Sequence, residues 1–315
     1  MTFALIKYLP TTANVPFIRG RMIALGFSAL LIAFSLFEFA SVGINFGIDF
    51  RGGIQTEVET GAETTTEDLR TVAAALNLGE PRIQEAGNQL QESRTFFVSL
   101  PLQPGEGNEA ELANQAAREA LEAALTENFA DLTVRGTTVI GGAVSQELVV
   151  TGFTAIGVAL FLMLIYIWFR FEWQYSLGAI VALIHDVILT VGMFSVTQMT
   201  FDLATVAAIL TIVGYSMNDT VVVYDRIREN LRKYKKMPLS EVLNLSINDT
   251  LSRTILTSLT TLAALISLYM IGGASLEGFA FAMIWGVLIG TYSSIFVAAP
   301  ILLFTEVQRE GTQPS

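Results

Sequence analysis

Long apolar runs dominate the pattern of hydrophobic and polar positions along this chain. A helix needs about 17–25 mostly apolar residues to cross the hydrocarbon layer of a bilayer, which is about 30 Å thick. Six runs meet this requirement, and we expect each of them to be a transmembrane helix. They cover Met22–Phe39, Leu148–Phe169, Leu177–Val196, Leu203–Tyr224, Thr254–Met270 and Phe279–Phe304.

The first run has a second interpretation as a secretory signal peptide, because Arg19 and Arg21 precede it and the sequence Glu-Phe-Ala ends it. However, it is longer than most apolar cores of signal peptides, which have about 7–15 residues. Its removal would also leave an odd number of spans. We therefore favour an uncleaved membrane anchor.

Basic residues gather on one side of the six-span path. Cytoplasmic connections of membrane proteins carry an excess of Lys and Arg. These residues are Lys7, Arg19, Arg21, Arg170, Arg226, Arg228, Arg232, Lys233, Lys235 and Lys236. The distribution predicts that both termini are cytoplasmic and that the long connection over residues 45–147 lies on the opposite side.

The long connection has the pattern of a small folded domain. Strand-like and helix-like stretches follow one another in the order β-α-β-β-α-β, which is the split βαβ unit of ferredoxin-like folds. Thr65 and Asp68 form a capping-box pattern before the first of these helices, and NQLQES at residues 88–93 predicts a hairpin loop. The expected elements are Gly53–Thr60, Glu67–Leu78, Pro81–Gly87, Arg94–Leu100, Ala110–Phe129 and Leu132–Ile140.

These elements divide the chain into consecutive segments. We expect a cytoplasmic N-terminal segment, the first span, the loop domain, three spans, a basic connection, two spans and a cytoplasmic tail. Their residues are 1–21, 22–44, 45–147, 148–224, 225–252, 253–305 and 306–315.

The composition fits a membrane protein and excludes several chemistries. The chain is 52% hydrophobic and 15% charged, with a mean hydropathy of +0.54. It has one His and no Cys, and it contains no HExxH, GxSxG or phosphate-loop motif. The sequence therefore argues against a zinc protease, a serine hydrolase and a phosphate-loop nucleotide-binding enzyme. The net charge of −11 disfavours nucleic acid, and we expect the basic connection to meet anionic lipid or a partner.

Asp219 is the most informative ionisable residue within the predicted spans. A charged side chain at the centre of a bilayer costs at least about 2.5–3.5 kcal/mol, so such residues are functional hypotheses. Asp219 follows Asn218 and lies six residues before Asp225, or roughly 9 Å along a helix. His185-Asp186 lies within the third span. The pKa of a histidine suits proton exchange near neutrality, but a satisfied packing pair is an equal alternative.

Arg253 is the expected charge partner of Asp219. If the fifth helix starts near Pro238, Arg253 lies at a similar depth and can pair with Asp219. Asp249 is a possible competitor for this arginine, and a purely structural staple between two helices is another interpretation. Four hydroxyl residues share one face of the fifth helix at helical spacing and predict a polar path or close helix packing: Thr254, Thr257, Ser258 and Thr261.

Several motifs together resemble the SecF family of the bacterial protein-export complex. They occur in family order along nearly the whole chain after the first span. They are GIDFRGG (47–53), IHD (184–186), GYSMNDTVVVYDRIREN (214–230), NDTLSRTILTSLTTL (248–262) and GGASLEGFAFAMIWGVLIGTYSS (272–294).

The resemblance implies a fold and a mechanism. SecF and its companion SecD belong to the resistance-nodulation-division (RND) superfamily, and each contributes six spans to a twelve-helix unit. We thus expect an α-helical membrane protein with an α+β ferredoxin-like periplasmic domain. Asp219 corresponds to the proton-coupling aspartate of the family and Arg253 to its charge partner, while a further aspartate is expected on SecD.

The same resemblance implies a bacterial inner-membrane protein that is not an enzyme. Its expected partners are SecD, the SecYEG translocon, YajC and unfolded preprotein, and protons are the coupling ion, with no other cofactor. Three alternatives remain at this point: a small-molecule exporter of the same superfamily, a non-transporting scaffold, and an intramembrane aspartyl protease that pairs Asp186 with Asp219.

Overall fold

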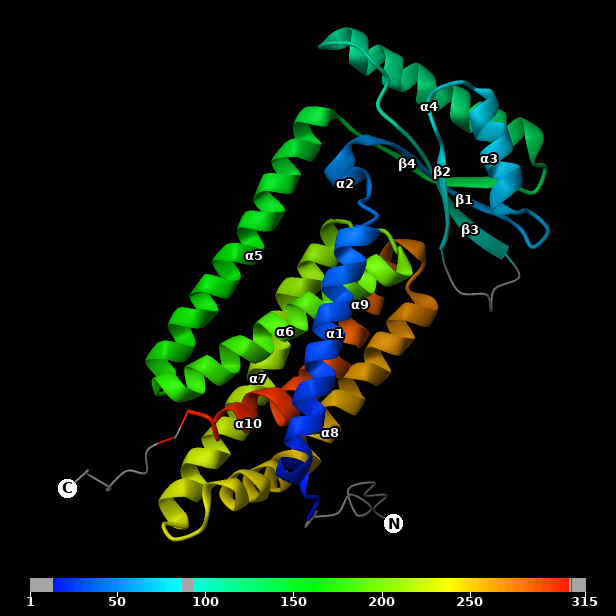
Figure 1. Ribbon diagram of the computed structural model, residues 1–315. Coiled ribbons are helices and arrows are strands. Elements are labelled where there is room, and N and C mark those ends of the chain that lie inside the picture. Colours follow the sequence, from blue (N-terminus) through cyan, green and yellow to red (C-terminus); the bar gives the residue numbers. More distant parts are fainter. Residues whose placement is uncertain (1–13, 87–92, 306, 308–315) are drawn as a thin grey trace.

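The computed structural model describes residues 14–86, 93–305 and 307. It consists of a bundle of long helices with a small α/β domain at one end of the bundle (Figure 1). Except for Ser93, the predicted hairpin loop at residues 88–93 lies outside the described residues, as do parts of both terminal segments.

The helices of the bundle confirm the apolar pattern. Within the described residues, six helices are long and apolar enough to span a membrane. They are α1 (Arg21–Ser41, after the short helix η2 at Phe17–Gly20), α5 (Gly142–Arg170), α6 (Trp173–Thr197), α7 (Leu203–Lys233), α8 (Leu239–Ile271) and α9 (Ala274–Ser293). The chain continues from α9 through the π-helix η3 (Ser294–Ala298) into α10 (Ala299–Ile301).

Helices α7 and α8 extend beyond the apolar runs at one end of the bundle, which we call the basic end because the bases between Arg226 and Lys236 lie there. Asp202 and Thr205 form a capping box that begins α7, and α7 then meets no glycine or proline after Gly214 until it ends at Lys233. Pro238 is the N-cap of α8. Because α8 starts this early, Arg253 lies well inside the helix.

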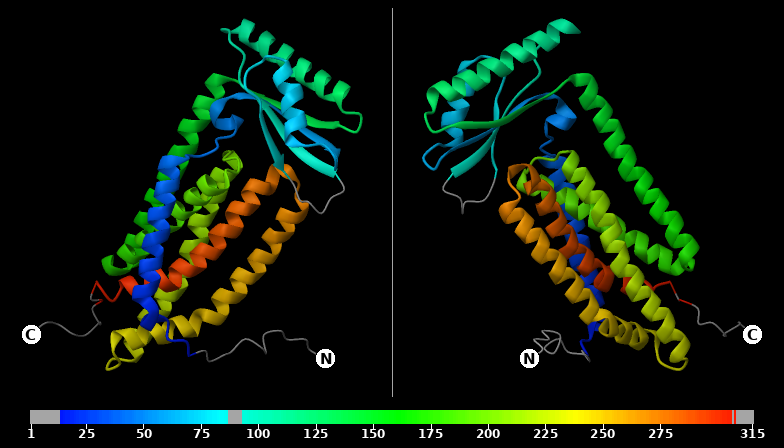
Figure 2. Two further views of the ribbon diagram at one scale, coloured as in Figure 1. Left: turned by 45° about the vertical axis from the view of Figure 1, so that its right-hand side comes forward. Right: turned by 180° about the vertical axis from the view of Figure 1, so that it is seen from behind.

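Small residues allow α9 to approach α7 closely. A Cβ atom added to Gly286 would lie 2.3 Å from Ile212 Cγ1, and one added to Gly290 would lie 3.0 Å from Ser216 Cβ. Helices in membranes associate through such close backbone contacts, because lipid offers no hydrophobic driving force between them. In contrast, α5 lies at the margin of the bundle (Figure 2), and only 6% of the residues in its most apolar stretch are buried.

The α/β domain has the predicted ferredoxin-like order. Four antiparallel strands form one sheet in the order β2-β3-β1-β4, and both domain helices lie over the same side of it (Figure 1). Thr65 caps the first helix through the expected capping box with Asp68. The elements are β1 (Gly53–Gly61), α3 (Thr66–Ala75), β2 (Arg82–Ala86), β3 (Ser93–Leu100), α4 (Asn108–Asn128) and β4 (Thr133–Ile140).

An aromatic joint connects the domain to the bundle. The short helix α2 (Ile48–Arg51) lies between α1 and β1. Phe46 forms a β-bridge with Phe201 in the α6–α7 connection, and the rings of Phe46, Phe50 and Phe201 lie 5.8–6.0 Å apart. Gly53 has φ +144°, and a Cβ there would lie 2.6 Å from the Leu100 carbonyl oxygen. Only glycine fits this turn into the sheet.

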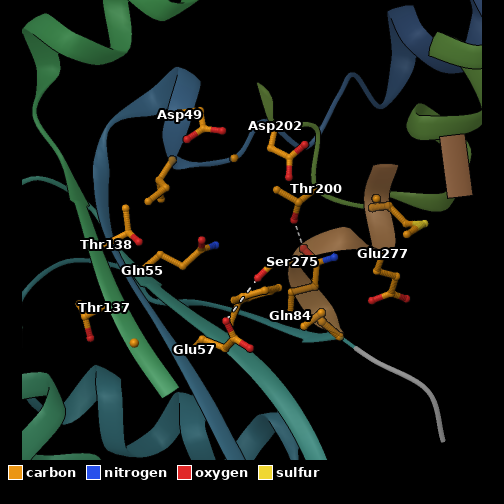
Figure 3. Close-up of a pocket in the computed structure, with 18 residues that line it drawn as sticks. Asp49, Gln55, Glu57, Gln84, Thr137, Thr138, Thr200, Asp202, Ser275 and Glu277 are labelled. Atoms are coloured by element: carbon orange, nitrogen blue, oxygen red, sulfur yellow. Dashed lines mark hydrogen bonds between the residues drawn. The ribbon is translucent and has the colours of Figure 1, made fainter. Parts of the chain in front are cut away.

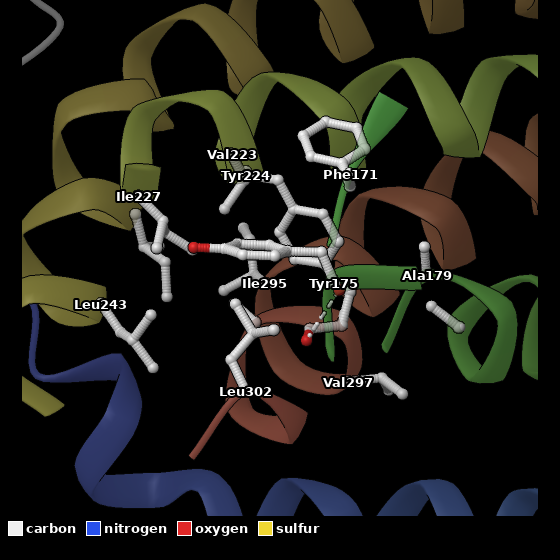
Figure 4. Packing of buried hydrophobic residues seen from close by; sticks show 14 of the residues in the cluster. Phe171, Tyr175, Ala179, Val223, Tyr224, Ile227, Leu243, Ile295, Val297 and Leu302 are labelled. Carbon is white, nitrogen blue, oxygen red and sulfur yellow. Dashed lines mark hydrogen bonds between the residues drawn. The ribbon is translucent and has the colours of Figure 1, made fainter. Parts of the chain in front are cut away.

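The core at the basic end of the bundle is built around aromatic rings (Figure 4). Tyr175 and Tyr224 are 1% exposed, and their ring centroids lie 5.1 Å apart in an edge-to-face arrangement. Phe171 packs edge-on against Tyr224 at 5.8 Å. The Tyr224 hydroxyl donates a 3.1 Å hydrogen bond to the Ala298 carbonyl oxygen in η3. This contact ties α7 to the π-helix.

Candidate proton-coupling site

Asp219 lies where three helical segments meet. The hydroxyl of Thr254 on α8 donates to Asp219 Oδ1 at 2.6 Å, and that of Ser294 at the start of η3 donates to Oδ2 at 2.5 Å. The residue is half-buried. An ionised carboxylate only accepts hydrogen bonds, whereas a protonated one also donates. A proton on one of the two oxygens turns that oxygen into a donor, so the hydroxyl that donates to it has to turn, while the other oxygen can still accept.

Asp186 forms a second and more enclosed polar cluster. His185 and Asp186 on α6 are 1% and 0% exposed, and His185 Nδ1 lies 2.9 Å from Asp186 Oδ1. The hydroxyls of Ser216 on α7 and Ser293 on α9 donate to Asp186 Oδ2 at 2.5 and 2.8 Å. The His185 ring stacks on Tyr292 with 6.1 Å between centroids. This cluster ties α6, α7 and α9 together.

The two clusters are neighbours along the chain on two helices. Ser216 precedes Asp219 by three residues on α7, and Ser293 directly precedes Ser294. Each carboxyl nevertheless has its own hydroxyl donors, and no hydrogen bond joins Asp186 to Asp219 in the described part of the chain. The facing pair of aspartates that an aspartyl protease needs is not formed.

Arg253 does not form the expected ion pair with Asp219. Its side chain is exposed, and over residues 14–86, 93–305 and 307 it has no carboxylate within 4.0 Å. The physical reason is rotation about the helix axis: Thr254 faces Asp219, so the preceding residue points outward. Arg253 still lies close enough for its charge to act on the Asp219 carboxylate. Asn218 is likewise exposed on α7, beside Asp219.

The predicted hydroxyl face of α8 is only partly directed into the bundle. Thr254 and Ser258 are buried, and Ser258 Oγ lies 2.7 Å from Thr291 Oγ1 on α9. Thr261 is half-buried, whereas Thr257 is exposed and donates to the Arg253 carbonyl oxygen of its own helix. Thr257 therefore lies outside the polar contact between α8 and α9.

Asp249 is not a competitor for Arg253. Its Oδ2 accepts from Arg226 Nε at 2.9 Å and from Asn230 Nδ2 at 3.1 Å, both on α7. This pairing joins α7 to α8 at the basic end of the bundle, one helical turn before Arg253.

The serines that donate to the two carboxyl groups are not among the residues predicted from the sequence. Ser216, Ser293 and Ser294 lie within the motifs quoted above, but small hydroxyl residues are also common helix-packing residues in membranes. Ser216 precedes Asp219 by about one helical turn, which is the one local signal that pointed to it. The contacts of Ser293 and Ser294 join α9 and η3 to other helices, and spacing along the chain does not reveal them.

A polar cavity, separate from the Asp219 and Asp186 clusters, lies between the α/β domain and the bundle. A cavity of about 320 Å³ separates β1, β2 and β4 from the nearby ends of α7 and α9 (Figure 3). Among the residues that the structure describes, its lining includes Asp49, Glu57, Asp202 and Glu277 and no Lys or Arg. Asp49 Oδ2 accepts from the Leu203 amide at 2.9 Å. Burial raises the pKa of Asp202, and the neighbouring charge of Asp49 adds to this effect, while hydrogen bonds from Thr205 lower it.

The bundle of six apolar helices, its enclosed carboxyl groups and the small α/β domain define a membrane-transport subunit rather than a soluble enzyme. Comparison with known proteins identifies the family. Residues 120–308 match the model of the SecD/SecF protein export membrane protein C-terminal family, and residues 39–63 match the SecD/SecF GG motif. The second match contains Gly52 and Gly53 at the joint.

Relatives and solved structures agree with this result. The chain is 44% identical to the protein translocase subunit SecF of Rhodobacter capsulatus, over 98% of this chain and 95% of that one. It is 41% identical to the protein translocase subunit SecDF of Brucella abortus, over 95% of this chain and 38% of that one. The crystal structure of SecDF from Thermus thermophilus superposes with a TM-score of 0.83 at 34% identity, covering 94% of this chain and 39% of that one.

The chain therefore belongs to the SecF family of protein translocase subunits. This membership gives it an accessory role in Sec protein export and makes it a transport subunit, not an enzyme. The RND-type architecture is confirmed by the structural match. The protease and scaffold interpretations and the small-molecule exporter are set aside by the same family assignment.

Proposed function

We propose that Asp219 is the proton-binding switch through which this subunit couples the proton-motive force to protein export. The observation that carries the proposal is the position of its carboxyl group, which accepts hydrogen bonds from α8 and η3 while it sits on α7. Three helical segments thus contact one ionisable group. Asp186 is fully enclosed and holds a fixed set of donors, which suits a structural anchor with His185 as its neighbour.

The free energy released when a proton crosses the membrane is similar in size to the free energy that typically couples two conformational states. A proton that crosses the whole membrane potential releases about 2.3 kcal/mol per 100 mV. Couplings between two conformational states are typically about 1–3 kcal/mol. Protonation of Asp219 turns one of its two oxygens into a donor, so the contact to Thr254 or to Ser294 must reorient. The release of the proton restores this contact and completes the cycle.

A SecD subunit covers the face that carries Asn218 and Arg253. Both side chains are exposed within membrane-spanning helices, and a guanidinium that faces lipid is costly. A carboxylate on a neighbouring membrane protein would satisfy Arg253. The SecDF relatives support this assignment, since the chain matches 38% of one such protein and 39% of another, which leaves room for a SecD part in the same polypeptide.

The basic end of the bundle lies in the cytoplasm and the α/β domain in the periplasm. The positive-inside rule supports this orientation, because the bases near the ends of α5, α7 and α8 share one side. The protein is then a multi-pass protein of the bacterial inner membrane. Its domain handles unfolded preprotein that emerges from the SecYEG translocon, with YajC as a further partner of the assembly.

The test is proton-driven export in inverted membrane vesicles that contain SecD and either the wild-type chain or Asp219→Asn. We expect the variant to lose the response of export to the proton gradient while ATP-driven export remains. Asp225→Asn is the matched control, because it makes the same change on the same helix in the surface ion pair with Arg170. An Asp219→Asn variant that responds to the gradient like the wild type refutes the proposal.

A further inference from the structure

Three consecutive residues at the junction of α9 and η3 contact three different helices. Ser293, the last residue of α9, donates to Asp186 on α6. Ser294, the first residue of η3, donates to Asp219 on α7. The preceding residue, Tyr292, contacts α1, which leads through α2 into the α/β domain (Figure 1). The first two contacts belong to the carboxyl clusters, whereas the third joins them to a helix that enters the domain.

The hydroxyl group of Tyr292 bridges two groups on α1. It donates to the Ala24 carbonyl oxygen at 2.9 Å, and it lies 3.0 Å from Ser28 Oγ. Because a tyrosine has a single hydroxyl proton, Ser28 is the donor in the second contact. Ser28 is 5% exposed, whereas 11% of the residues in the most apolar stretch of Phe17–Ser41 are buried. The bridge is therefore a polar contact with a helix that the bundle encloses little.

The ring of Tyr292 stacks with two other rings. The His185 ring on α6 lies 6.1 Å from it between centroids, and the Phe296 ring in η3 lies 5.1 Å from it. Both pairs are stacked, with 26° and 27° between the ring planes, and such pairs stabilise beyond the area that they bury. Phe296 belongs to the same short π-helix as Ser294. A movement of η3 that starts at Ser294 therefore reaches the Tyr292 ring through Phe296.

We propose that Tyr292 is a positioning residue that passes the change at Asp219 to α1 and through α1 to the α/β domain. The inference rests on the proposed function, in which Asp219 binds the coupling proton. A proton at Asp219 Oδ2 turns the hydroxyl of Ser294, and η3 shifts together with its aromatic ring. The Tyr292 hydroxyl then changes its hydrogen bonds to α1. The proton itself stays on Asp219, and only hydrogen bonds change in these steps.

A fixed staple between α9 and α1 is the competing interpretation of the same contacts. Interhelical hydrogen bonds also hold membrane helices together without any movement. The two interpretations differ in how Tyr292 responds to Asp219. A staple keeps its hydrogen bonds when Asp219 changes its protonation state, whereas a positioning residue does not.

The test follows both groups by infrared difference spectroscopy between high and low pH, on the full chain with SecD in lipid nanodiscs. A carboxylic-acid C=O band that appears at low pH is assigned to Asp219 by its absence in Asp219→Asn. A shift of a tyrosine C–O band is assigned to Tyr292 by its absence in Tyr292→Phe, which keeps the ring and its stacking. Tyr166→Phe is the matched control, because it makes the same change on a ring of α5 that is 50% exposed.

We expect the Tyr292 band to stay unshifted in Asp219→Asn, because an amide takes up no proton at this position. The Asp219 band should remain in Tyr292→Phe, and Tyr166→Phe should show both changes. A Tyr292 shift that persists in Asp219→Asn overturns the inference and leaves the proposed function standing. A wild type with the Asp219 band and no Tyr292 shift has the same consequence. A wild type without the Asp219 band overturns the proposed function, and the inference with it.

Export in inverted membrane vesicles is the second measurement. An interhelical hydrogen bond in a membrane contributes the equivalent of about 3–18-fold in an equilibrium constant. We therefore expect Tyr292→Phe to reduce the response of export to the proton gradient by a factor in this range, and Tyr166→Phe to respond like the wild type. Unfolding of both variants in SDS checks that the bundle is intact. Equal responses of the two variants overturn the inference.

Discussion

Gly178 on α6 is a position where one added methyl group should disturb the bundle. A Cβ there would lie 2.4 Å from the Tyr224 hydroxyl oxygen and 2.9 Å from the Ala298 carbonyl oxygen. These two atoms form the hydrogen bond that ties α7 to η3. Gly178→Ala would therefore force α6 away from both elements or break that bond.

The magnitude follows from two contributions. Overpacking a well-packed core costs about 1–3 kcal/mol. Loss of the buried hydrogen bond adds about 1 kcal/mol, because the Ala298 carbonyl then lacks its partner. The better helix propensity of alanine offsets about 0.5–1 kcal/mol of this cost. We thus expect Gly178→Ala to lower the free energy of unfolding by about 1–3.5 kcal/mol.

The assay is unfolding of the purified chain in mixed micelles with increasing SDS, followed by circular dichroism. Gly157→Ala is the matched control, because Gly157 lies in α5 and an added Cβ has no atom within 4 Å. The control should be unchanged or slightly more stable. The double variant Gly178→Ala/Tyr224→Phe should regain part of the loss, since the nearer of the two contacts is removed. If Gly178→Ala unfolds like Gly157→Ala, the packing argument is wrong.

Two further predictions concern the carboxyl groups. Ser294→Ala should slow proton-driven export in vesicles severalfold. Ser293→Ala should leave the proton dependence of export intact and lower the free energy of unfolding by about 0.6–1.7 kcal/mol, the range for interhelical hydrogen bonds in membranes. The same defect in both variants would contradict separate roles for the two serines. Burial and the charge of Asp49 raise the pKa of Asp202. Ionisation of Asp202 therefore disfavours the folded state. The stability that is present at low pH is lost as the pH rises through this raised pKa. Asp202→Asn keeps a good helix cap and should flatten this part of the pH–stability profile in thermal unfolding, and an unchanged profile would count against it.

The fold was largely predictable because its signals are local. The spans follow from the length of apolar runs, and the first domain helix follows from the capping box of Thr65 and Asp68. The β-α-β-β-α-β order follows from alternating periodicity, and the sheet order confirms it. The joint through Phe46 and Phe201 was not predictable, since those residues lie far apart in the chain and nothing local marks their bridge.

The site was predictable in depth but not in direction. Counting residues along α7 and α8 placed Asp219 and Arg253 at similar levels of the membrane. It did not say which way each side chain points about its helix axis, and one residue changes that direction by about 100°. Thr254 thus occupies the place expected for Arg253. The serine donors were not predicted either, because the carboxyl groups that accept from them lie on other helices.

The π-helix η3 explains how Asp219 is connected to the core at the basic end. Its first residue, Ser294, donates to Asp219, and its last, Ala298, accepts from Tyr224. Helix α7 therefore holds η3 at two points, and π-helical turns are frequent at functional sites because their backbone departs from the regular hydrogen-bond ladder. If Asp219 takes up a proton at Oδ2, we expect the contact to Ser294 to change while the Ala298 contact remains. We expect η3 to pivot about its Tyr224 end, and Gly178 leaves the space that keeps this end of η3 close to α6.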